Sequence, residues 1–289
     1  MQPDVDSLQS LLPPARYELR RFKSGPCFFR RTDDTPVVVQ LVDAPASEGL
    51  QHAQRLVHPN VQQILELFPT PAGLIVVRAF LPAHDLSTLI RKRRAQGGYQ
   101  VGEFHRIAAQ CCAGLAAIHA AGLVHGNLSP ETIRVDESRA ALLDFELPDS
   151  GPRLSLPDAP RPAHGGRAYL SPVRLRGGGR SPEDDVYALG LTLLQMWTCR
   201  IPEVYRGPLT RPLRDQIQLD AFAALTPRDL QHLHRMLQAD PKKRPQAQDL
   251  RFAASPPAEA AEPPEEPAAP LDDEASLANL SYAEWSEPP

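Results

Sequence analysis

Short apolar runs dominate the first third of the chain, and helical spacing of apolar residues dominates the rest. The runs 17-YELRRF-22, 37-VVVQLV-42, 61-VQQILEL-67 and 74-LIVVRAF-80 predict β-strands, because they are short and rich in β-branched and aromatic residues. The segment 47-SEGLQHAQRLV-57 predicts a helix between the second and third strands.

Four later segments place apolar residues at helical spacing: 85–95, 101–122, 183–198 and 228–237. Asp85 and Thr226 are expected N-caps, and Gly122 is an expected C-cap. A β-rich part followed by a helical part predicts an α+β fold.

Composition divides the 289 residues into a body and a tail. Apolar residues make up 42% of the chain, an ordinary value for a globular domain. Residues 255–289 contain nine acidic residues and no basic one, so the tail has a formal charge of −9 against +5 for the body. The expected divisions are a flexible N-terminus (1–16), a folded domain (17–252) and a disordered, acidic, Pro-rich tail (253–289). A body of such mild charge does not predict nucleic-acid binding.

The N-terminus and the cysteines bear on the compartment. Residues 1–16 lack the basic start and apolar core of a signal peptide, and the longest apolar stretch, 186–199, is too short to span a bilayer. No cysteine belongs to a CxxC motif, so buried thiols in a reducing compartment are expected. We therefore expect a cytoplasmic protein with no membrane span.

Five motifs occur in the order in which eukaryotic-type protein kinases carry them. HGNLSPETI (125–133) stands where these kinases have HRDLKPENI, and LLDFE (142–146) stands where they have the DFG turn. The others are GRAYLSPVRL (166–175), DDVYALG (184–190) and DPKKRP (240–245). Over residues 17–252 the chain resembles a degenerate Ser/Thr protein kinase. The resemblance implies a bilobal fold, with a small β-rich N-lobe and a larger helical C-lobe.

The resemblance also locates the positions that would handle nucleotide. Phosphoryl transfer needs a held nucleotide, neutralised charge and a base that orients the incoming hydroxyl. The phosphate-binding lysine position is Gln40, which cannot supply a positive charge. The base position is Asn127, whose amide cannot accept the hydroxyl proton. The glycine loop retains only Gly25.

Further substitutions surround these positions. Ser129 stands at the catalytic-loop lysine, Thr132 at the metal-binding Asn, and Gly126 at the Arg that would grip an activation-loop phosphate. Asp144 is the one metal ligand that remains, and one carboxylate is a poor Mg²⁺ site. From these residues we predict a pseudokinase that is not an enzyme and uses no cofactor.

Two arginines fall in the slot where the resemblance places adenine. Arg78 stands at the gatekeeper position and Arg134 beneath the adenine. Either they pair with carboxylates or water, with Glu48 a candidate for Arg78, or they extend to solvent. Both readings disfavour ATP.

A third set matches the scaffold of the family. Ala53, Ile64, His125 and Phe145 match the column of side chains that links the lobes. Asp185 matches the buried Asp that anchors the loop of His125. Arg244 matches an arginine whose usual glutamate partner is here Val173.

Three functions remain open from the sequence. The first is a protein-binding scaffold or allosteric regulator, whose partner would be an active kinase or other signalling enzyme. The second is a weakly active phosphotransferase that uses Lys23, displaced into the glycine loop, with Asp144. The third is nucleotide or anion binding without transfer.

Two groups of residues are candidates for partner binding. Residues 147–180 carry six arginines and two aspartates, a surface for an acidic partner or for the chain's own tail, or an ordinary solvated loop. Arg167, Arg174 and Arg176 are the candidates here. The tail ends in 277-LANLSYAEW-285, where Tyr282 and Trp285 are candidate anchors that would order on binding in cis or in trans.

Overall fold

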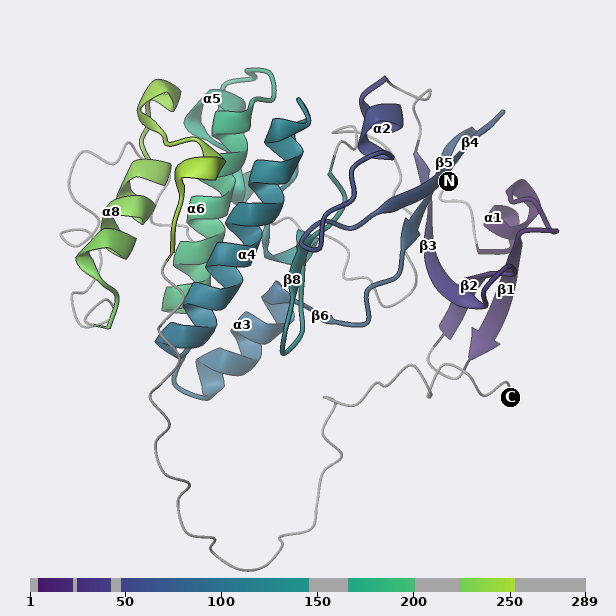
Figure 1. The fold of residues 1–289 in the computed structure, drawn as a ribbon, viewed down its shortest axis with the longest axis horizontal. Helices are drawn as coiled ribbons and strands as arrows, with labels where there is room; N and C mark the ends of the chain where they lie inside the picture. The colour runs from purple at the N-terminus through teal and green to yellow at the C-terminus, as the bar shows by residue number, and fades with distance from the viewer. Residues whose placement is uncertain (1–4, 23–24, 43–47, 146–165, 201–223, 253–289) are drawn as a thin grey trace, which may run out of the picture.

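The computed structural model describes residues 5–22, 25–42, 48–145, 166–200 and 224–252 (Figure 1). Figure 1 shows strands β1 to β5 gathered on one side and helices α3, α4, α6 and α8 on the other. The structure confirms the predicted α+β plan, with a β-rich N-lobe followed by a helical C-lobe.

The N-lobe sheet is antiparallel and has the strand order β1-β2-β3-β5-β4. Its strands are β1 (Tyr17–Phe22), β2 (Gly25–Arg30), β3 (Thr35–Val42), β4 (Ile64–Thr70) and β5 (Gly73–Ala79). Residues 74–78 of β5, an interior strand between β3 and β4, are all buried, which fits a run without polar alternation.

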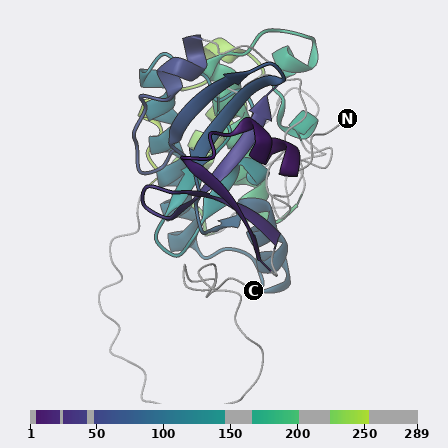
Figure 2. The same ribbon diagram turned by 90° about the vertical axis from the view of Figure 1, so that its right-hand side faces the viewer.

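The N-terminus differs from the expected flexible segment. Residues 5–11 form the helix α1 (Val5–Leu11), and Leu8 is buried together with the following Leu12. Both leucines belong to an apolar cluster with Tyr17 and other residues of the sheet. Figure 2 shows α1 lying across the strands. The spacing of leucines at positions 8, 11 and 12 is helical, and this apolar face explains why the segment is ordered.

Helix α2 (Glu48–Ala53) is shorter than the predicted 47–57. After residue 53 the amides of Arg55 and Leu56 bond to carbonyls three residues earlier, so the helix tightens into turns before 58-HPN-60. Its register leaves Ala53 fully buried.

The C-lobe is built on α3 (Leu86–Ala95), α4 (Val101–Ala120), α6 (Pro182–Thr198) and α8 (Pro227–Met236). Asp85 caps α3 through the amide of Thr88, and Thr226 forms a capping box with Asp229, as expected of both N-caps. Helix α4 ends with Ala121 as its C-cap, and Gly122 follows in the left-handed region at φ 72°. Gly122, the expected C-cap, therefore lies one position beyond the observed cap.

Shorter elements connect these helices. The strands β6 (His84–Asp85), β7 (Ile133–Val135) and β8 (Ala140–Leu142) form a second, three-stranded sheet. The remaining short helices are η1 (Pro130–Thr132), η2 (Gly166–Tyr169), α5 (Pro172–Leu175), η5 (Pro241–Lys243) and η6 (Ala247–Asp249). Among the described residues, no helix combines the length and apolar character needed to cross a membrane.

One apolar core crosses from the sheet into the helices. It joins Ile64 and Val76 of the N-lobe to Leu115 of α4 and Leu193 of α6. The two lobes therefore share one apolar core, which fixes the N-lobe relative to the C-lobe.

Gly114 in α4 marks a close approach of this core to the turn before β4. A Cβ at this position would lie 2.5 Å from the Asn60 carbonyl oxygen, a backbone atom that cannot swing away. We expect Gly114→Ala to lower the free energy of unfolding by about 2 kcal/mol, measured by urea denaturation. The control is Gly102→Ala near the start of the same helix, where no atom lies within 4 Å. That change should be neutral or slightly stabilising, and equal losses at both positions would contradict the prediction.

Candidate functional site

Asp185 of α6 anchors the loop of residues 125–132. The Asp185 carboxylate accepts hydrogen bonds from the amides of His125 and Gly126, both at 2.7 Å. Its Oδ2 atom also lies 3.0 Å from Nε2 of His119. The side chain of Asp185 is 2% exposed, so the carboxylate is held by these groups rather than by water. The structure therefore brings together the two residues that the sequence assigned to the loop and its anchor.

His125, Phe145, Ile64 and Ala53 are all fully buried where the lobes meet. They come from the loop, the turn after β8, β4 and α2. Ile64, Ala53 and Phe145 belong to the core that both lobes share. The structure thus buries all four residues of the predicted column, whereas the column itself stays a prediction.

Burial lowers the pKa of the His125 imidazole to about 4, although Asp185 and Asp144 act in the opposite direction. Arg78 adds to the lowering, since it is a like charge. His125 is therefore neutral in the folded protein at pH 7.

This shift makes folding acid-sensitive. Between pH 6.5 and about 4 the unfolded chain binds a proton at His125 that the folded chain does not, so stability falls as the pH is lowered through this window. We expect His125 alone to lower the free energy of unfolding by about 3 kcal/mol across this pH window. Urea denaturation at several pH values should give a shallower pH dependence for His125→Phe than for the wild type. A control variant, His52→Phe, should keep the wild-type slope, and equal slopes for all three would contradict the prediction.

The position of Arg78 decides between the two alternatives left open by the sequence, which were a paired side chain and one that extends to solvent. The side chain is fully buried, and its Nε atom lies 3.9 Å from Oδ1 of Asp144. Its Nη2 atom donates to the Phe145 carbonyl at 3.4 Å, and its guanidinium carbon lies 5.7 Å from the centre of the Phe145 ring. Arg78 therefore contacts the DFE turn and does not extend to solvent. The side chain of Glu48, the partner considered from the sequence, is outside the described residues.

Arg134 takes a different course. Its Nη1 atom donates to the Ala83 carbonyl at 2.9 Å, in the segment that links the lobes. Burial lowers the pKa of its guanidinium, while Asp85 and Asp144 act in the opposite direction. The residue that the resemblance places beneath an adenine is therefore an arginine tied to the linker backbone.

Gln40 lies in β3, beside Val76 of β5 in the sheet register, and is 2% exposed. Its Oε1 atom is buried and makes no hydrogen bond to any described residue. Gln62, in the segment before β4, differs in this respect, because its Nε2 atom donates to the Ala79 carbonyl at 2.8 Å. Gln40 thus places a neutral amide where the family has a lysine, and its Oε1 atom has no hydrogen-bond partner among the described residues.

The polar loop residues serve the backbone of the loop. The Thr132 hydroxyl accepts from the Ser129 amide at 3.0 Å, and it lies 3.1 Å from the carbonyl oxygens of Asn127 and Ser129. Ser129 and Thr132 are both buried. The residue at the metal-binding Asn position is therefore committed to holding the loop in shape.

The family resemblance implies Mg²⁺ and ATP, and the site can be tested against them. Asp144 is 31% exposed and stands at φ 58°, turned toward Arg78. The described residues contain no group of three His, Cys, Asp or Glu side chains that could hold a metal ion. With Gln40 neutral, Thr132 committed to the loop and Arg78 beside Asp144, the described residues do not fit Mg²⁺–ATP in the way usual for the family.

Arg244 has acquired a new carboxylate partner. Its Nη1 atom lies 3.4 Å from Oδ1 of Asp184 and donates to the Glu183 carbonyl at 3.0 Å. Its Nε atom donates to the Gln238 carbonyl at 2.8 Å, and its guanidinium stacks 4.8 Å from the centre of the Tyr187 ring. The sequence identified the loss of the partner at position 173 but not its replacement one helix away. The adjacent pair Asp184–Asp185 was the available signal.

The remaining candidates are only partly described. Arg174 lies in α5 and is half-buried, and Arg176, its C-cap, is exposed. Arg167 lies in η2, but its side chain is outside the described residues. Lys23, Tyr282 and Trp285 are outside them entirely. The sequence counted Arg180 among the six arginines of residues 147–180 but did not place it near Gly126, over which it packs.

Comparisons with known proteins locate the chain among kinases. A family model described as "Protein kinase domain" matches residues 42–252. The chain is 26% identical over 203 residues to the hormonally up-regulated neu tumor-associated kinase homolog A of Xenopus laevis, covering 68% of this chain and 29% of that protein. It is 25% identical over 223 residues to the serine/threonine-protein kinase PknD of Chlamydia felis (66% and 24%). It is 29% identical over 162 residues to the serine/threonine-protein kinase pkn3 of Myxococcus xanthus (52% and 28%). The chain thus spans less than a third of the length of these relatives.

These relatives contradict one prediction from the sequence. The chain was predicted not to be an enzyme because Gln40, Asn127 and Thr132 replace the usual groups, yet all three relatives are named as kinases. These substitutions show which chemical groups are replaced, but they do not by themselves show that the protein lacks catalytic activity. The family model covers most of the chain and agrees with the fold described above. The chain belongs to the protein kinase family.

Proposed function

We propose that this domain acts as a protein-binding regulator of a signalling enzyme, for which an active kinase is the expected class of partner. The observation that carries the proposal is the contact of Arg78 with Asp144 and Phe145. The turn that a kinase orders around its nucleotide is here held by a buried side chain of the protein itself. The lobes are thereby fixed relative to one another without a ligand, as a docking surface requires.

Charge at the C-lobe surface supports the same role. Arg174 lies in α5 and lines a pocket together with Asn127, and Arg176 is the exposed C-cap of α5. Arginine is enriched at protein interfaces, where its planar fork pairs with carboxylates and phosphates. An acidic partner segment, or the acidic tail of this chain, has the complementary charge.

A second candidate is phosphoryl transfer by a rearranged set of residues, with Lys23 and Asp144 in the leading roles. The names of the relatives favour it. Lys23 is the one lysine that precedes Lys92 in the sequence, so it is the available lysine of the N-lobe. No step of that reaction follows from the described residues.

One reconstitution separates the two candidates. Partners would be cross-linked to the full chain, identified by mass spectrometry and purified, and their activity measured with and without the chain. For a regulator, the wild type and Lys23→Ala should change the partner's activity to the same extent, with or without ATP. An effect that requires Mg²⁺–ATP and disappears in Lys23→Ala would overturn the proposal.

Transfer of labelled phosphate would be followed in the same samples. The second candidate requires incorporation that is lost in Lys23→Ala and in Asp144→Ala. The control is Lys92→Ala, an exposed lysine on α3. Incorporation that persists in both test variants would exclude these two residues as its source.

A further inference from the structure

The C-terminal end of helix α3 carries four consecutive basic residues, 91-RKRR-94, and the helix contains no acidic residue. Arg91, Lys92 and Arg94 are exposed, whereas Arg93 is half-buried. Cations in the last turn of a helix interact favourably with its dipole, but basic side chains three positions apart repel one another. This end of α3 is therefore a compact positive patch that favours an anionic partner.

The described residues supply a carboxylate to one side chain of this patch. The Nη2 atom of Arg93 lies 2.9 Å from Oε1 of Glu103 in α4. Arg91 instead donates to the Thr88 hydroxyl, an uncharged group, at 2.8 Å. Within the described ranges no ion pair is recorded for Arg91 or Arg94, and these two residues lie three positions apart on one face of the helix.

The described part of the chain ends close to the basic patch. Phe252, the last described residue, is buried, and its ring packs edge-on against Phe104 with ring centres 5.9 Å apart. Phe104 follows Glu103 in the first turns of α4, and Figure 1 shows the beginning of α4 beside α3. Two side-chain contacts therefore connect the point where residues 253–289 begin with the end of α3.

The segment 259–274 has a charge that complements the patch. It contains seven acidic residues and no basic one, and three of the acidic residues are adjacent in 272-DDE-274. Residues 146–165 and 201–223, which also lie outside the described ranges, carry formal charges of −1 and 0. The segment 259–274 begins seven residues after Phe252, and a chain can span about 3.3 Å per residue, so α3 is within its reach.

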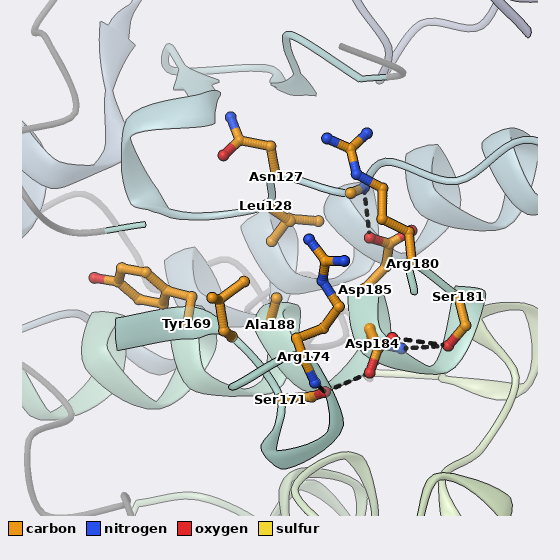
Figure 3. A pocket seen from close by; sticks show the side chains of 12 residues that line it. Asn127, Leu128, Tyr169, Ser171, Arg174, Arg180, Ser181, Asp184, Asp185 and Ala188 are labelled. Carbon is orange, nitrogen blue, oxygen red and sulfur yellow. Dashed lines mark hydrogen bonds between the residues drawn. The ribbon is translucent and has the colours of Figure 1, made fainter. Parts of the chain in front are cut away.

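The pocket beside α5 is a weaker match for this segment. Its lining brings Arg174 and Arg180 together with Asp184 and Asp185 (Figure 3). Cations and carboxylates are equal in number there, whereas α3 has no acidic residue. The positive charge that an acidic segment would meet is therefore greater at the end of α3.

We propose that the acidic segment 259–274 of this chain docks on Arg91 and Arg94 of α3. Both guanidinium groups can form paired hydrogen bonds with the carboxylates of 272-DDE-274. Each exposed pair is weak, but the tether gives the segment an effective concentration on the order of millimolar. The inference goes beyond the proposed function, because it concerns a contact of the chain with itself and requires no partner enzyme.

Carbodiimide cross-linking of the full chain at low ionic strength tests this contact. The reagent joins an amine to a carboxylate when the two groups touch, and Lys92 supplies an amine next to Arg91. Mass spectrometry of the digested protein should find Lys92 joined to carboxylates of residues 259–274. The exposed lysines Lys242 and Lys243 of η5 serve as references, and each should give at least fivefold less of this product. High salt should abolish the excess at Lys92.

A pair of charge reversals tests the two arginines. Arg91→Glu combined with Arg94→Glu should lower the Lys92 yield at least fivefold. The matched control is Arg228→Glu combined with Arg235→Glu, which changes the charge equally at two exposed arginines of α8. That helix also lies close to the end of the described chain, because its residue His232 packs against Phe252 with ring centres 5.5 Å apart. The control should keep the wild-type yield.

Thermal denaturation of each variant shows whether it remains folded. If the charge reversals unfold the protein, Arg91→Gln combined with Arg94→Gln takes their place and should lower the yield in the same direction. The salt dependence in the wild type needs no variant at all. Equal yields at Lys92 and at the reference lysines, or a Lys92 yield that survives both changes in α3, would overturn the docking site.

The identity of the occupant is tested by cross-linking a mixture of unlabelled and isotopically labelled chains. Products that carry the same label in both halves are expected, because the segment belongs to the same chain as α3. Products of mixed label would assign the site to a second copy, and cross-links from Lys92 to residues 146–165 or 201–223 would assign it to another segment. Either result would contradict the proposal. The reconstitution with a purified partner is a separate measurement, so the regulatory role can stand when this contact fails.

Discussion

Asp185→Ala is expected to lower the free energy of unfolding by about 4 kcal/mol, the largest single effect at this site. The change leaves the amides of His125 and Gly126 buried without their acceptor, and each such loss costs about 1–3 kcal/mol. It also removes the contact with His119. Urea denaturation followed by circular dichroism would measure the loss.

The matched control is Glu183→Ala. Glu183 is another acidic residue in the first turn of α6, so both substitutions remove the same favourable interaction with the helix dipole, worth at most about 1 kcal/mol. Of these two carboxylates, that of Asp185 accepts hydrogen bonds from the 125–132 loop, whereas none is recorded for that of Glu183 among the described residues. A loss for Asp185→Ala no greater than that for Glu183→Ala would show that the loop holds its shape without the carboxylate.

The second large effect concerns the pair of Arg78 and Asp144. Asp144→Ala should lower the free energy of unfolding by about 2 kcal/mol, because it removes the carboxylate nearest to a fully buried guanidinium. The value lies below the range for fully buried pairs, since Asp144 is partly exposed to solvent. In an Arg78→Met background, where no cation needs a partner, the same change should cost less than about 0.5 kcal/mol.

A double-mutant cycle makes this comparison directly. Arg78→Met alone should be close to neutral or stabilising, because an apolar side chain of similar length can replace a buried ion pair. The surface pair of Arg30 and Asp33 serves as the control cycle, and its coupling should be smaller than that of Arg78 and Asp144. Equal costs of Asp144→Ala in both backgrounds would mean that the two side chains are not energetically coupled.

Periodicity predicted the elements that bury a regular face. The strands around Val39 and Val76 and the long helices α4 and α6 follow directly from the spacing of apolar residues. Helix α1 was missed because seven residues give too little periodicity to outweigh the neighbouring prolines. The packing against Tyr17 that orders it is a tertiary contact, which no local pattern reports.

The site shows the same division. Motif order located His125, Asp144 and Asp185 from the sequence, because their spacing along the chain is that of the family. The partners of Arg78 and Arg244 could not be predicted, since both depend on which carboxylate lies closest in space. The position of Arg180 over Gly126 could not be predicted for the same reason, since the two residues lie 54 positions apart.

The transfer of Arg244's acidic partner to Asp184 has a consequence for how this protein can diverge. Position 173 no longer anchors a charge, and Val173 instead packs against Gly178. Substitutions at position 173 are therefore limited only by the shape of the side chain. A change at position 184 would leave the buried guanidinium of Arg244 without its carboxylate partner. Position 173 should therefore accept many different residues, whereas position 184 should require an acidic one. A library of folded variants should show this difference.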